Sequence, residues 1–491
     1  MLIVVILVIY GLEKTKTYFM KKTTIKLWKM LVCVFLFGAV FSSCEKEENL
    51  SESEENLATD LQEPPFKNYM VISESSDLTK SVENSLKTSG SEIVSSIPEI
   101  GISIVSSKDV NFIENSMKKK NINAVVPDYE IAWIPTSKGI EANLPEATPS
   151  IGSTEPYYFY DYLWGLEAID APDAWNAGFT GSGANVFVLD SGIDAEHVEL
   201  APNLNTSLSA SFVPGEDWNV LESTPFDNHG THVAGTIAAA QNGLGLIGVA
   251  PHAELVAVKV LSEFTGSGAF SSINAGIVYA GENSADVINM SLGVTLNKNG
   301  KLIDANGDPY KIPAKYVMEI VNAQQKAIDY AYKKGSTIIA SAGNDGVNYD
   351  GNSAYIKLPG GLNNVVTVSA TAPEGYDWTA DYTNFDIPSS YTTHGKSLVD
   401  IAAPGGDGDV ALDDMILSTG NNNSLFWSAG TSMAAPHVSG VAALIIAKNG
   451  GDMNPQEVTK QIEKTADKVD GNGQSTFFGK GRINAYRAVT E

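Results

Sequence analysis

Cysteine is almost absent from this chain. Its 491 residues include two cysteines, Cys33 and Cys44, and both lie in the first tenth of the sequence. No disulfide can therefore cross-link the rest of the chain, so its stability has to come from the size of the core and, in an exported protein, from bound metal. Hydrophobic residues make up 43% of the chain, which is enough for a large core, and the length predicts two or three domains.

Positive charge is scarce as well. Lysine and arginine number 32 against 58 aspartates and glutamates, so the formal net charge is -26. The acidic residues are spread along the chain and are not gathered in one tail. This balance argues against a nucleic-acid partner and suits an exported enzyme, whose acidic loops can attract divalent cations.

The two apolar runs near the start, residues 2–10 and 30–41, are shorter than the roughly 20 residues that a membrane-spanning helix needs. The second run follows a basic segment that begins at Met20, and small residues follow it, which is the order of a secretory signal. We therefore expect residues 1–44 to be a leader, with Met20 as the better start. Residues 45–65 are acidic and rich in serine, which predicts a disordered tether.

The end of the leader, Ser42-Ser43-Cys44, resembles a bacterial lipobox, although Phe41 stands where leucine is usual. The resemblance implies that Cys44 is lipidated, becomes the mature N-terminus and anchors the protein to the outer membrane or cell surface. The alternative is a plain signal peptide that is cut nearby and releases an extracellular protein.

Residues 66–134 alternate short strands and helices. The pattern predicts strands at 69–73, 91–98, 101–106 and 125–130 and helices at 78–87 and 112–120. The order βαββαβ is the ferredoxin-like arrangement, a small α+β domain. Residues 135–156 contain scattered Pro, Gly, Ser and Thr without periodicity, which predicts a linker.

Residues 157–491 alternate apolar strands with helices, which predicts an α/β domain, a mostly parallel sheet with helices on both faces. The expected strands are 185–189, 254–261, 286–292, 336–341, 365–370 and 398–402. The expected helices are 231–240, 271–280, 315–334, 432–448 and 455–465.

Three polar residues stand at the ends of these elements. Asp190 ends a strand, His229 opens a helix, and Ser432 follows Thr431, a candidate N-cap, in the first turn of another helix. Backbone N–H groups and the helix dipole favour negative charge in that turn. A lone serine there is usually part of an ordinary capped helix, so the aspartate and the histidine are what make a nucleophile plausible.

The blocks around Asp190, His229 and Ser432, and a fourth at residues 340–346, closely resemble the motifs of subtilisin-like serine proteases, the subtilases, whose triad has the same chain order. The resemblance implies that Asp190 orients His229, which takes the proton of Ser432. It also implies that the Asn344 side chain and the Ser432 N–H hold the oxyanion. It implies an inhibitory pro-domain at 66–134, self-cleavage in the linker and a catalytic domain at 157–491.

The resemblance also assigns residues to peptide binding, with the substrate lying between two segments. These residues are Gly266, Ser267 and Gly268 with the aromatic Phe270, and Ser291, Leu292 and Gly293. The side-chain pocket would lie between Ser291–Gly293 and Ser341, Ala342 and Gly343. Its base would fall within 347–358, where Lys357 would favour an acidic substrate side chain.

A loop at 241–247 resembles the subtilase loop that holds a structural Ca²⁺. The matching ligands are Glu199, Ala240, Asn242, Leu244 and Leu246, although aspartate is commoner where Glu199 stands. The alternative is a metal-free turn. Residues 304–308 are also acidic, but the early glycine and the following Pro309 favour a polar surface turn.

The leading hypothesis is a secreted, lipid-anchored serine endopeptidase that is made as a self-processing zymogen and acts on peptides or proteins. One alternative is a non-catalytic surface binding protein on the same scaffold, which the complete triad and Asn344 argue against. Another is a maturation protease restricted to a single partner, which the sequence leaves open.

Overall fold

The computed structural model describes residues 67–134, 139–142, 144, 160–220, 229–303, 309–375, 383–471 and 473–491. The predictions for the leader (1–44, with Met20 and Cys44), the tether (45–65) and the turn at 304–308 lie outside the described residues. So does most of the linker at 135–156.

The central sheet of residues 160–491 is mostly parallel, as predicted. Its strands follow the order β18-β17-β15-β11-β7-β9-β8, with β19 also on β17. Among the described strands of this sheet, β17 and β18 pair antiparallel and the other neighbouring strands pair parallel. The strands are β7 (Asn185–Asp190), β8 (Ala210–Ser211), β9 (Glu254–Lys259), β11 (Val287–Met290), β15 (Thr337–Ser341), β17 (Val366–Ala372), β18 (Ile387–Pro388) and β19 (Ile401–Pro404).

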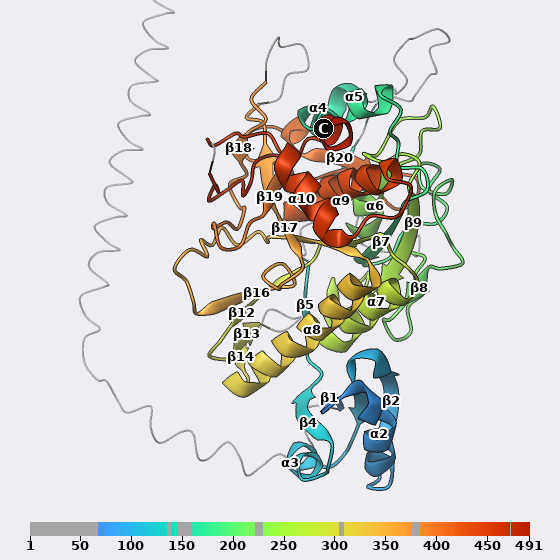
Figure 1. Cartoon of the computed structure of the whole chain (residues 1–491), viewed down its shortest axis with the longest axis vertical. Helices are drawn as coiled ribbons and strands as arrows, with labels where there is room; N and C mark the ends of the chain where they lie inside the picture. Colours follow the sequence, from blue (N-terminus) through green and yellow to red (C-terminus); the bar gives the residue numbers. More distant parts are fainter. Residues whose placement is uncertain are drawn as a thin grey trace, which may run out of the picture. The chain divides into compact units, whose positions relative to one another are not determined.

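Helices cover both faces of this sheet (Figure 1). Val186 and Val188 of β7 join the hydrophobic cluster of α6 (His229–Ala238) and α9 (Thr431–Lys448). Phe187 and Leu189 join the cluster of α7 (Phe270–Glu282) and α8 (Ala314–Lys334). Because successive side chains of a strand point to opposite faces, an unbroken apolar strand is what a sheet covered on both sides requires.

The predicted element ends agree with the structure to within a few residues. The strand expected at 398–402 instead spans Ile401–Pro404, because Leu398 and Val399 are buried in a turn whose N–H groups donate to Gly395 O. Further elements are α4 (Trp164–Ala168), α5 (Ala171–Asn176), α10 (Pro455–Thr465), α11 (Ala485–Thr490), β6 (Ile140–Glu141), β12 (Val294–Asn297), β13 (Lys301–Ile303), β14 (Pro309–Lys311), β16 (Tyr355–Leu358), β20 (Ile416–Thr419) and β21 (Leu425–Ser428), with 3-10 turns η3 (Tyr160–Tyr162) and η4 (Leu412–Asp414).

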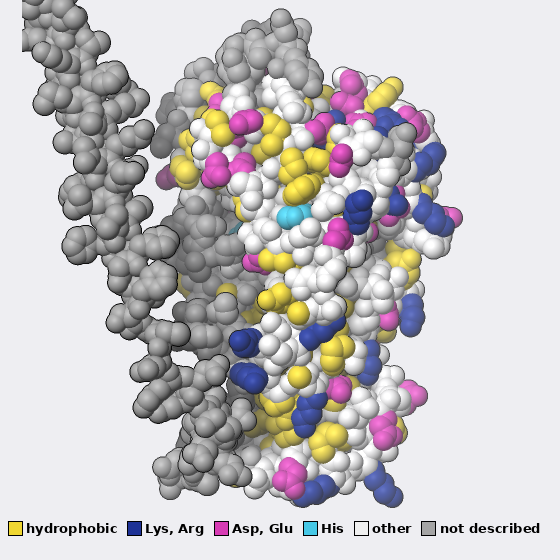
Figure 2. All heavy atoms as spheres, turned by 90° about the vertical axis from the view of Figure 1, so that its left-hand side faces the viewer, with side chains coloured by type: hydrophobic (Ala, Val, Ile, Leu, Met, Phe, Trp, Pro, Cys, Tyr) yellow, Lys and Arg dark blue, Asp and Glu magenta, His cyan; other side chains and the backbone are white. Residues whose placement is uncertain are grey.

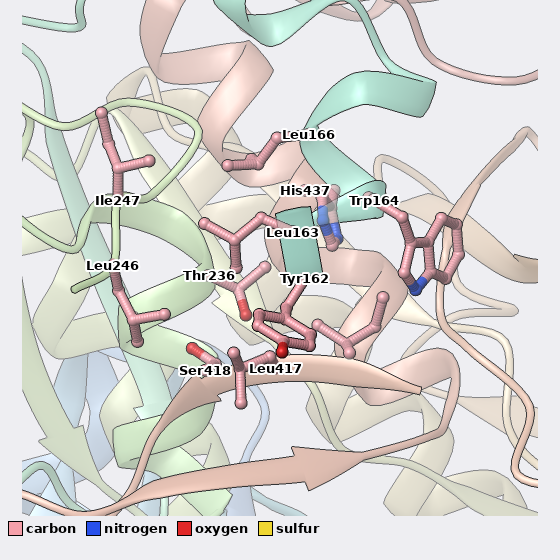
Figure 3. Close-up of a pocket in the computed structure, with 13 residues that line it drawn as sticks. Tyr162, Leu163, Trp164, Leu166, Thr236, Leu246, Ile247, Leu417, Ser418 and His437 are labelled. Carbon is pink, nitrogen blue, oxygen red and sulfur yellow. The ribbon is translucent and has the colours of Figure 1, made fainter. Parts of the chain in front are cut away.

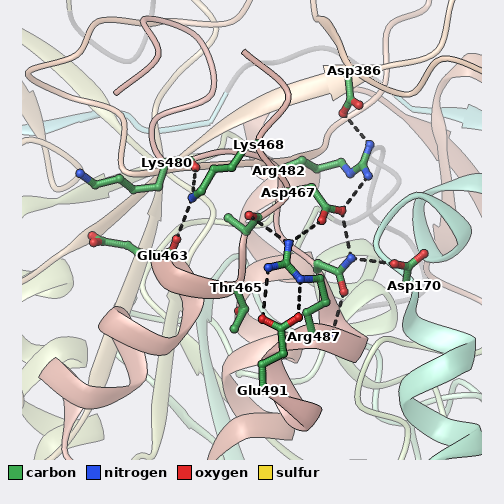
Figure 4. A network of polar contacts seen from close by, with 12 residues as sticks. Asp170, Asp386, Glu463, Thr465, Asp467, Lys468, Lys480, Arg482, Arg487 and Glu491 are labelled. Atoms are coloured by element: carbon green, nitrogen blue, oxygen red, sulfur yellow. Dashed lines mark hydrogen bonds and ion pairs between the residues drawn. The ribbon is translucent and has the colours of Figure 1, made fainter. Parts of the chain in front are cut away.

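A polar network fastens the last segment of the chain (Figure 4). The Arg482 guanidinium donates to Asp386 at 2.6 Å and to Asp467 at 3.0 Å, and Arg487 also donates to Asp467 at 3.0 Å. Asn484 donates to Asp467 and, at 2.6 Å, to Asp170, which precedes α5. Single exposed ion pairs contribute little, but Arg482 is largely buried and holds two carboxylates at once.

Acidic, basic and hydrophobic side chains are interspersed over the described residues on the face drawn in Figure 2. The excess of negative charge is therefore not a single acidic block on this face. Among the described helices, none combines the length and the apolar character that crossing a membrane requires.

Residues 67–134 form the predicted βαββαβ order, with an antiparallel sheet in the strand order β2-β3-β1-β4. The elements are β1 (Asn68–Ser73), η1 (Ser76–Leu78), α2 (Thr79–Lys87), β2 (Glu92–Ile97), η2 (Pro98–Ile100), β3 (Ile102–Ser106), α3 (Phe112–Met117) and β4 (Ile122–Pro127). The single strand expected at 125–130 is wrong. β4 ends at Pro127, and β5 (Glu130–Ala132) pairs with β10 (Ser267–Ala269) instead.

The two faces of the small sheet pack against different partners. Tyr69 and Val71 of β1 join a small cluster with Val82 and Leu86 of α2. Met70 and Ile72 point to the other face and belong to the cluster that contains α7 and α8. The second face is therefore buried against α7 and α8 and not by helices of residues 67–134.

Candidate active site

The carboxyl end of β7 places Asp190 beside the first residue of α6. His229 Nδ1 lies 2.9 Å from Asp190 Oδ1 and 3.0 Å from Oδ2. Because a carboxylate accepts, Nδ1 carries the proton and Nε2 keeps a lone pair. Asp190 is fully buried and also accepts from Ser191 N at 2.7 Å. The buried Lys259 holds the next carbonyl, Ser191 O, at 2.7 Å, a contact that the sequence did not suggest.

Ser432 is the second residue of α9 and is 5% exposed. Its Oγ donates to Ser291 O at 3.0 Å, and Ser291 Oγ donates to Ser432 O at 2.7 Å. The predicted N-cap role of Thr431 is wrong, because Gly430 holds that position and no side chain caps it. The Thr431 hydroxyl is instead used by a distant partner, Asn344.

Asn344 is held in one orientation. Its Oδ1 accepts from Thr431 N at 2.9 Å and from Thr431 Oγ1 at 2.8 Å, which leaves Nδ2 as the end that can donate. A Cβ added to Gly430 would lie 3.2 Å from Asn344 Nδ2 and 3.6 Å from Ser432 N. Asn344 Nδ2 and Ser432 N therefore face the same small space, which stays open because residue 430 is a glycine. An oxyanion needs two donors that converge in this way.

The predicted substrate segments come together around a segment of the chain itself. Gly268 pairs with Ile131 in the antiparallel β5–β10 ladder. Trp133 N donates to Gly266 O at 3.1 Å, and Gly293 N donates to Trp133 O at 3.0 Å. Residues 130–134 thus lie between the two segments as an added strand, which is how an extended peptide binds to a sheet edge.

Trp133 covers Phe270, an interaction that sequence reasoning missed. The ring centroids are 4.9 Å apart in an edge-on arrangement, and Trp133 Nε1 donates to Gly268 O at 2.9 Å. Phe270 is fully buried. A tryptophan directly after an alternating strand was the signal available, but nothing in the sequence says which surface it meets.

Two further histidines of the motif helices, His232 and His437, make structural contacts. His232 Nε2 donates to Ile416 O and Phe426 O, and His437 Nδ1 donates to Met433 O. Burial lowers the pKa of each to about 4. Both are therefore neutral at neutral pH and leave His229 as the histidine that faces Asp190.

The donors at the predicted calcium loop are all oxygens. Glu199 is buried; its Oε1 accepts from Leu246 N at 3.0 Å, whereas its Oε2 is buried without a hydrogen-bond partner. Asn242 Nδ2 donates to Val198 O, which turns Oδ1 toward the loop, where it accepts from Leu244 N. Burial raises the pKa of Glu199. A buried carboxylate with an unused oxygen, near an amide oxygen and carbonyls, fits a hard cation such as Ca²⁺.

Glu199 would be the sole acidic ligand of such an ion. Nowhere in the described ranges do three or more His, Cys, Asp or Glu side chains gather as a metal cluster. The predicted carbonyl ligands at Ala240, Leu244 and Leu246 belong to the same loop, which is closed by Ala240 N donating to Glu199 O at 2.8 Å.

A separate small cavity of about 20 Å³ is lined by residues of α4, α6, β20 and α9 (Figure 3). Tyr162, Leu163 and Trp164 line one side of it, and Thr236, Ser418 and His437 contribute polar atoms. Its volume is that of roughly one water molecule, so it is too small for a substrate side chain.

Comparison with known proteins gives the family of this arrangement. The model of the subtilase family matches residues 181–481. This chain is a subtilase. Thermitase of Thermoactinomyces vulgaris is 35% identical over 335 residues, 68% of the subtilase described here and 97% of thermitase. A thermophilic serine proteinase of Bacillus sp. (strain AK1) is 31% identical and covers 81% of this subtilase and 84% of its own length. The subtilase is accordingly a serine endopeptidase.

Solved structures agree on the fold. The epidermin leader peptide processing serine protease of Staphylococcus aureus has a TM-score of 0.67 at 23% identity and covers 87% of this subtilase and 98% of its own chain. A lanthipeptide protease has a TM-score of 0.54 at 25% identity over 67% of this subtilase and 94% of its own chain.

Proposed function

We propose that this serine endopeptidase is made as a zymogen whose residues 66–134 block the substrate groove until the chain cuts its own linker. The observation that carries the proposal is the position of residues 130–134, hydrogen-bonded to both Gly266 and Gly293. A segment so placed excludes a substrate from the same backbone donors and acceptors.

The proposed chemistry starts with proton transfer from Ser432 Oγ to His229 Nε2. In the resting arrangement the serine hydroxyl donates to Ser291 O. A substrate N–H that takes this carbonyl would displace the hydroxyl and free it for the imidazole. Asp190 stabilises the imidazolium that forms as the serine oxygen attacks the carbonyl. The C–N bond of the tetrahedral intermediate then breaks, and His229 Nε2 gives its proton to the leaving amine, which departs and leaves an acyl-enzyme. Water that gives a proton to His229 hydrolyses this acyl-enzyme and releases Ser432.

The negative charge of the tetrahedral intermediate would be held by Asn344 Nδ2 and Ser432 N. Ser432 N lies in the first helical turn, where backbone N–H groups have no intrahelical acceptor. Thr431 supports the site by fixing the Asn344 amide before any substrate arrives. Preorganised donors of this kind need no rearrangement as charge develops.

Self-processing can be tested with residues 45–491, expressed with and without Ser432→Ala. We expect the unmutated chain to lose residues 66–134, the pro-region, through a cut within 135–156. The variant should keep its full mass. Two chains that both remain intact under conditions where they fold, or that are both cut alike, would contradict self-processing.

A maturation protease restricted to one partner is the second candidate. It is favoured by the similarity to the lanthipeptide protease. The two candidates differ in how the processed enzyme treats unrelated unfolded proteins: a general endopeptidase degrades them, and a maturation protease leaves them intact.

Calcium is proposed as a structural cofactor of the loop at 241–247. Glu199, Asn242 and the carbonyls of Ala240, Leu244 and Leu246 would hold it, and the ion would supply rigidity to the loop that follows α6.

Export and anchoring through Cys44 are proposed from the leader alone. Fatty-acid labelling that is absent from a Cys44→Ser variant would support the anchor.

A further inference from the structure

A lysine is buried between the two segments that the sequence assigns to the walls of the substrate side-chain pocket. Lys357 of β16 is 3% exposed. A Cβ added to Gly343 would overlap its Nζ and lie 2.6 Å from its Cε. A Cβ added to Gly293 would lie 3.3 Å from Cε and 3.8 Å from Nζ. The ammonium group therefore lies in the space that both glycines keep open.

This space adjoins the candidate catalytic groups on both sides. Gly343 directly precedes Asn344, and Gly293 lies two residues after Ser291, whose carbonyl accepts from Ser432 Oγ. β16 is held in place by β12, where Lys357 pairs with Thr295. The side chain of the residue attacked by Ser432 would enter between these walls and meet the lysine.

The ammonium group is poorly paired for a buried charge. Nζ has two contacts, Thr295 Oγ1 at 3.3 Å and Asp345 Oδ2 at 3.4 Å, both longer than a good charge-assisted hydrogen bond. Asp345 is 51% exposed, and its Oδ2 already accepts from Thr295 Oγ1 at 2.9 Å. Burial lowers the pKa of Lys357, and Asp345 opposes this effect. A second carboxylate would give the third N–H a partner and reduce the cost of burying the charge.

We propose that Lys357 makes this enzyme select acidic side chains, glutamate or aspartate, on the residue whose carbonyl is attacked. The proposal rests on the proposed function, because it places that residue by Ser432 and Asn344. Lys357 also occupies volume that a large apolar side chain would need, and it repels lysine and arginine. The competing interpretation is that Asp345 neutralises Lys357 and the shortened pocket selects small neutral side chains.

The linker sequence gives the proposal a second consequence. Residues 135–139 (PTSKG) connect residues 130–134, which lie in the substrate groove, to β6, and they contain no carboxylate. Glu141 and Glu146, further along the linker, each precede an alanine. An enzyme that selects acidic side chains would not cut directly after residues 130–134, so these residues persist as an inhibitor. It would cut after Glu141 or Glu146 instead.

The test measures how the processed enzyme cleaves peptides that differ only at this position, where they carry Glu, Asp, Gln, Ala, Phe or Lys. We expect kcat/KM for Glu to exceed that for Gln at least tenfold. Lys357→Met should bring the Glu-to-Gln ratio close to one or below, and Asp345→Asn should raise it. Labelling of Ser432 by a fluorophosphonate shows that each variant is folded. It also separates failure of the Lys357 proposal from failure of the proposed function, because an enzyme that takes no label contradicts the proposed function itself.

A labelled enzyme with no preference for Glu or Asp over Gln, or with a preference for Ala, would overturn the assignment of Lys357. Mass analysis adds a second result. A mature N-terminus at Ala142 or Ala147 extends the proposal to self-processing, and one between residues 135 and 140 contradicts that extension.

Discussion

The small sheet of residues 67–127 and the large sheet of the catalytic region bury their faces in different ways. The large sheet has helices of its own region on both sides, α6 and α9 on one and α7 and α8 on the other. The small sheet has its own helix α2 on one side, and its other side adds Met70 and Ile72 to the cluster of α7 and α8.

The difference shows that the two regions depend on each other unequally. A sheet with one uncovered apolar face and fewer than 70 residues has little core with which to offset its conformational entropy. The catalytic region has helices of its own on both faces of its sheet, whereas residues 67–127 complete their core against α7 and α8 of that region. Folding and inhibition by residues 66–134 should therefore be coupled.

The largest expected effect is a loss of catalytic rate when Asn344 of the catalytic region is replaced. Asn344→Ala removes one of the two proposed oxyanion donors, and kcat of the processed enzyme should fall by about 10²–10³-fold because Ser432 N would then have to hold the charge without the amide. Steady-state kinetics measure this. Binding of the pro-region should be unchanged, and an equal loss of that binding would mean that the variant is misfolded and that the comparison has failed.

The next prediction tests whether the folding of the pro-region depends on contact with the catalytic region. The fragment 66–134 should be largely unfolded alone and gain structure when the processed catalytic region is added, as followed by circular dichroism. Trp133→Ala removes a buried aromatic at the centre of the interface, so inhibition should weaken by about 100-fold. Val94→Ala, at an exposed site of the same region, is the matched control. A stable isolated fragment would contradict the coupling.

Asp128 should make pro-region binding depend on pH. Burial raises its pKa to about 6, although Ser271 donates to it from both N and Oγ. The bound carboxyl therefore holds its proton up to higher pH than the free one, whose ordinary pKa is 3.8. Binding from this group is strongest below pH 4 and is lost as the pH rises through 6, by roughly 10- to 100-fold. Inhibition measured from pH 4 to 7.5 should show this slope, and Asp128→Asn should flatten it. An unchanged slope in the variant would assign it to other groups.

The smallest expected effect concerns the proposed calcium. Chelation should lower the melting temperature of the processed enzyme by about 5 °C, since an ion that binds only the folded state stabilises it by mass action. Glu199→Gln should melt at the lower temperature with or without calcium. A melting temperature indifferent to chelator would favour the metal-free turn.

The sequence predicted the large sheet and the places of Asp190, His229 and Ser432 at the ends of their elements because the local patterns are strong. The catalytic roles of these residues and of Asn344 stay predictions. It failed where a tertiary partner decides the outcome. Thr431 has the right chemistry for an N-cap, but Asn344 takes its hydroxyl. The alternating run at 125–130 continues through the point where Asp128 turns to Ser271, so it looks like one strand when it serves two sheets.

Lys357 shows a third limit. Its chemistry could be read from the sequence, but the sequence does not say which residue of 347–358 reaches the pocket. The pairing of β16 with β12 fixes that register, because it sets Lys357 opposite Thr295 and beside Gly293.

The central claim is that a complete catalytic centre is blocked by the chain's own residues 130–134. The most direct measurement is fluorophosphonate labelling, mapped by peptide mass, before and after removal of the pro-region. We predict slow labelling of Ser432 in the unprocessed chain and rapid labelling once the pro-region is gone. A folded catalytic region that has been freed of the pro-region by an added protease and still takes no label would contradict the account.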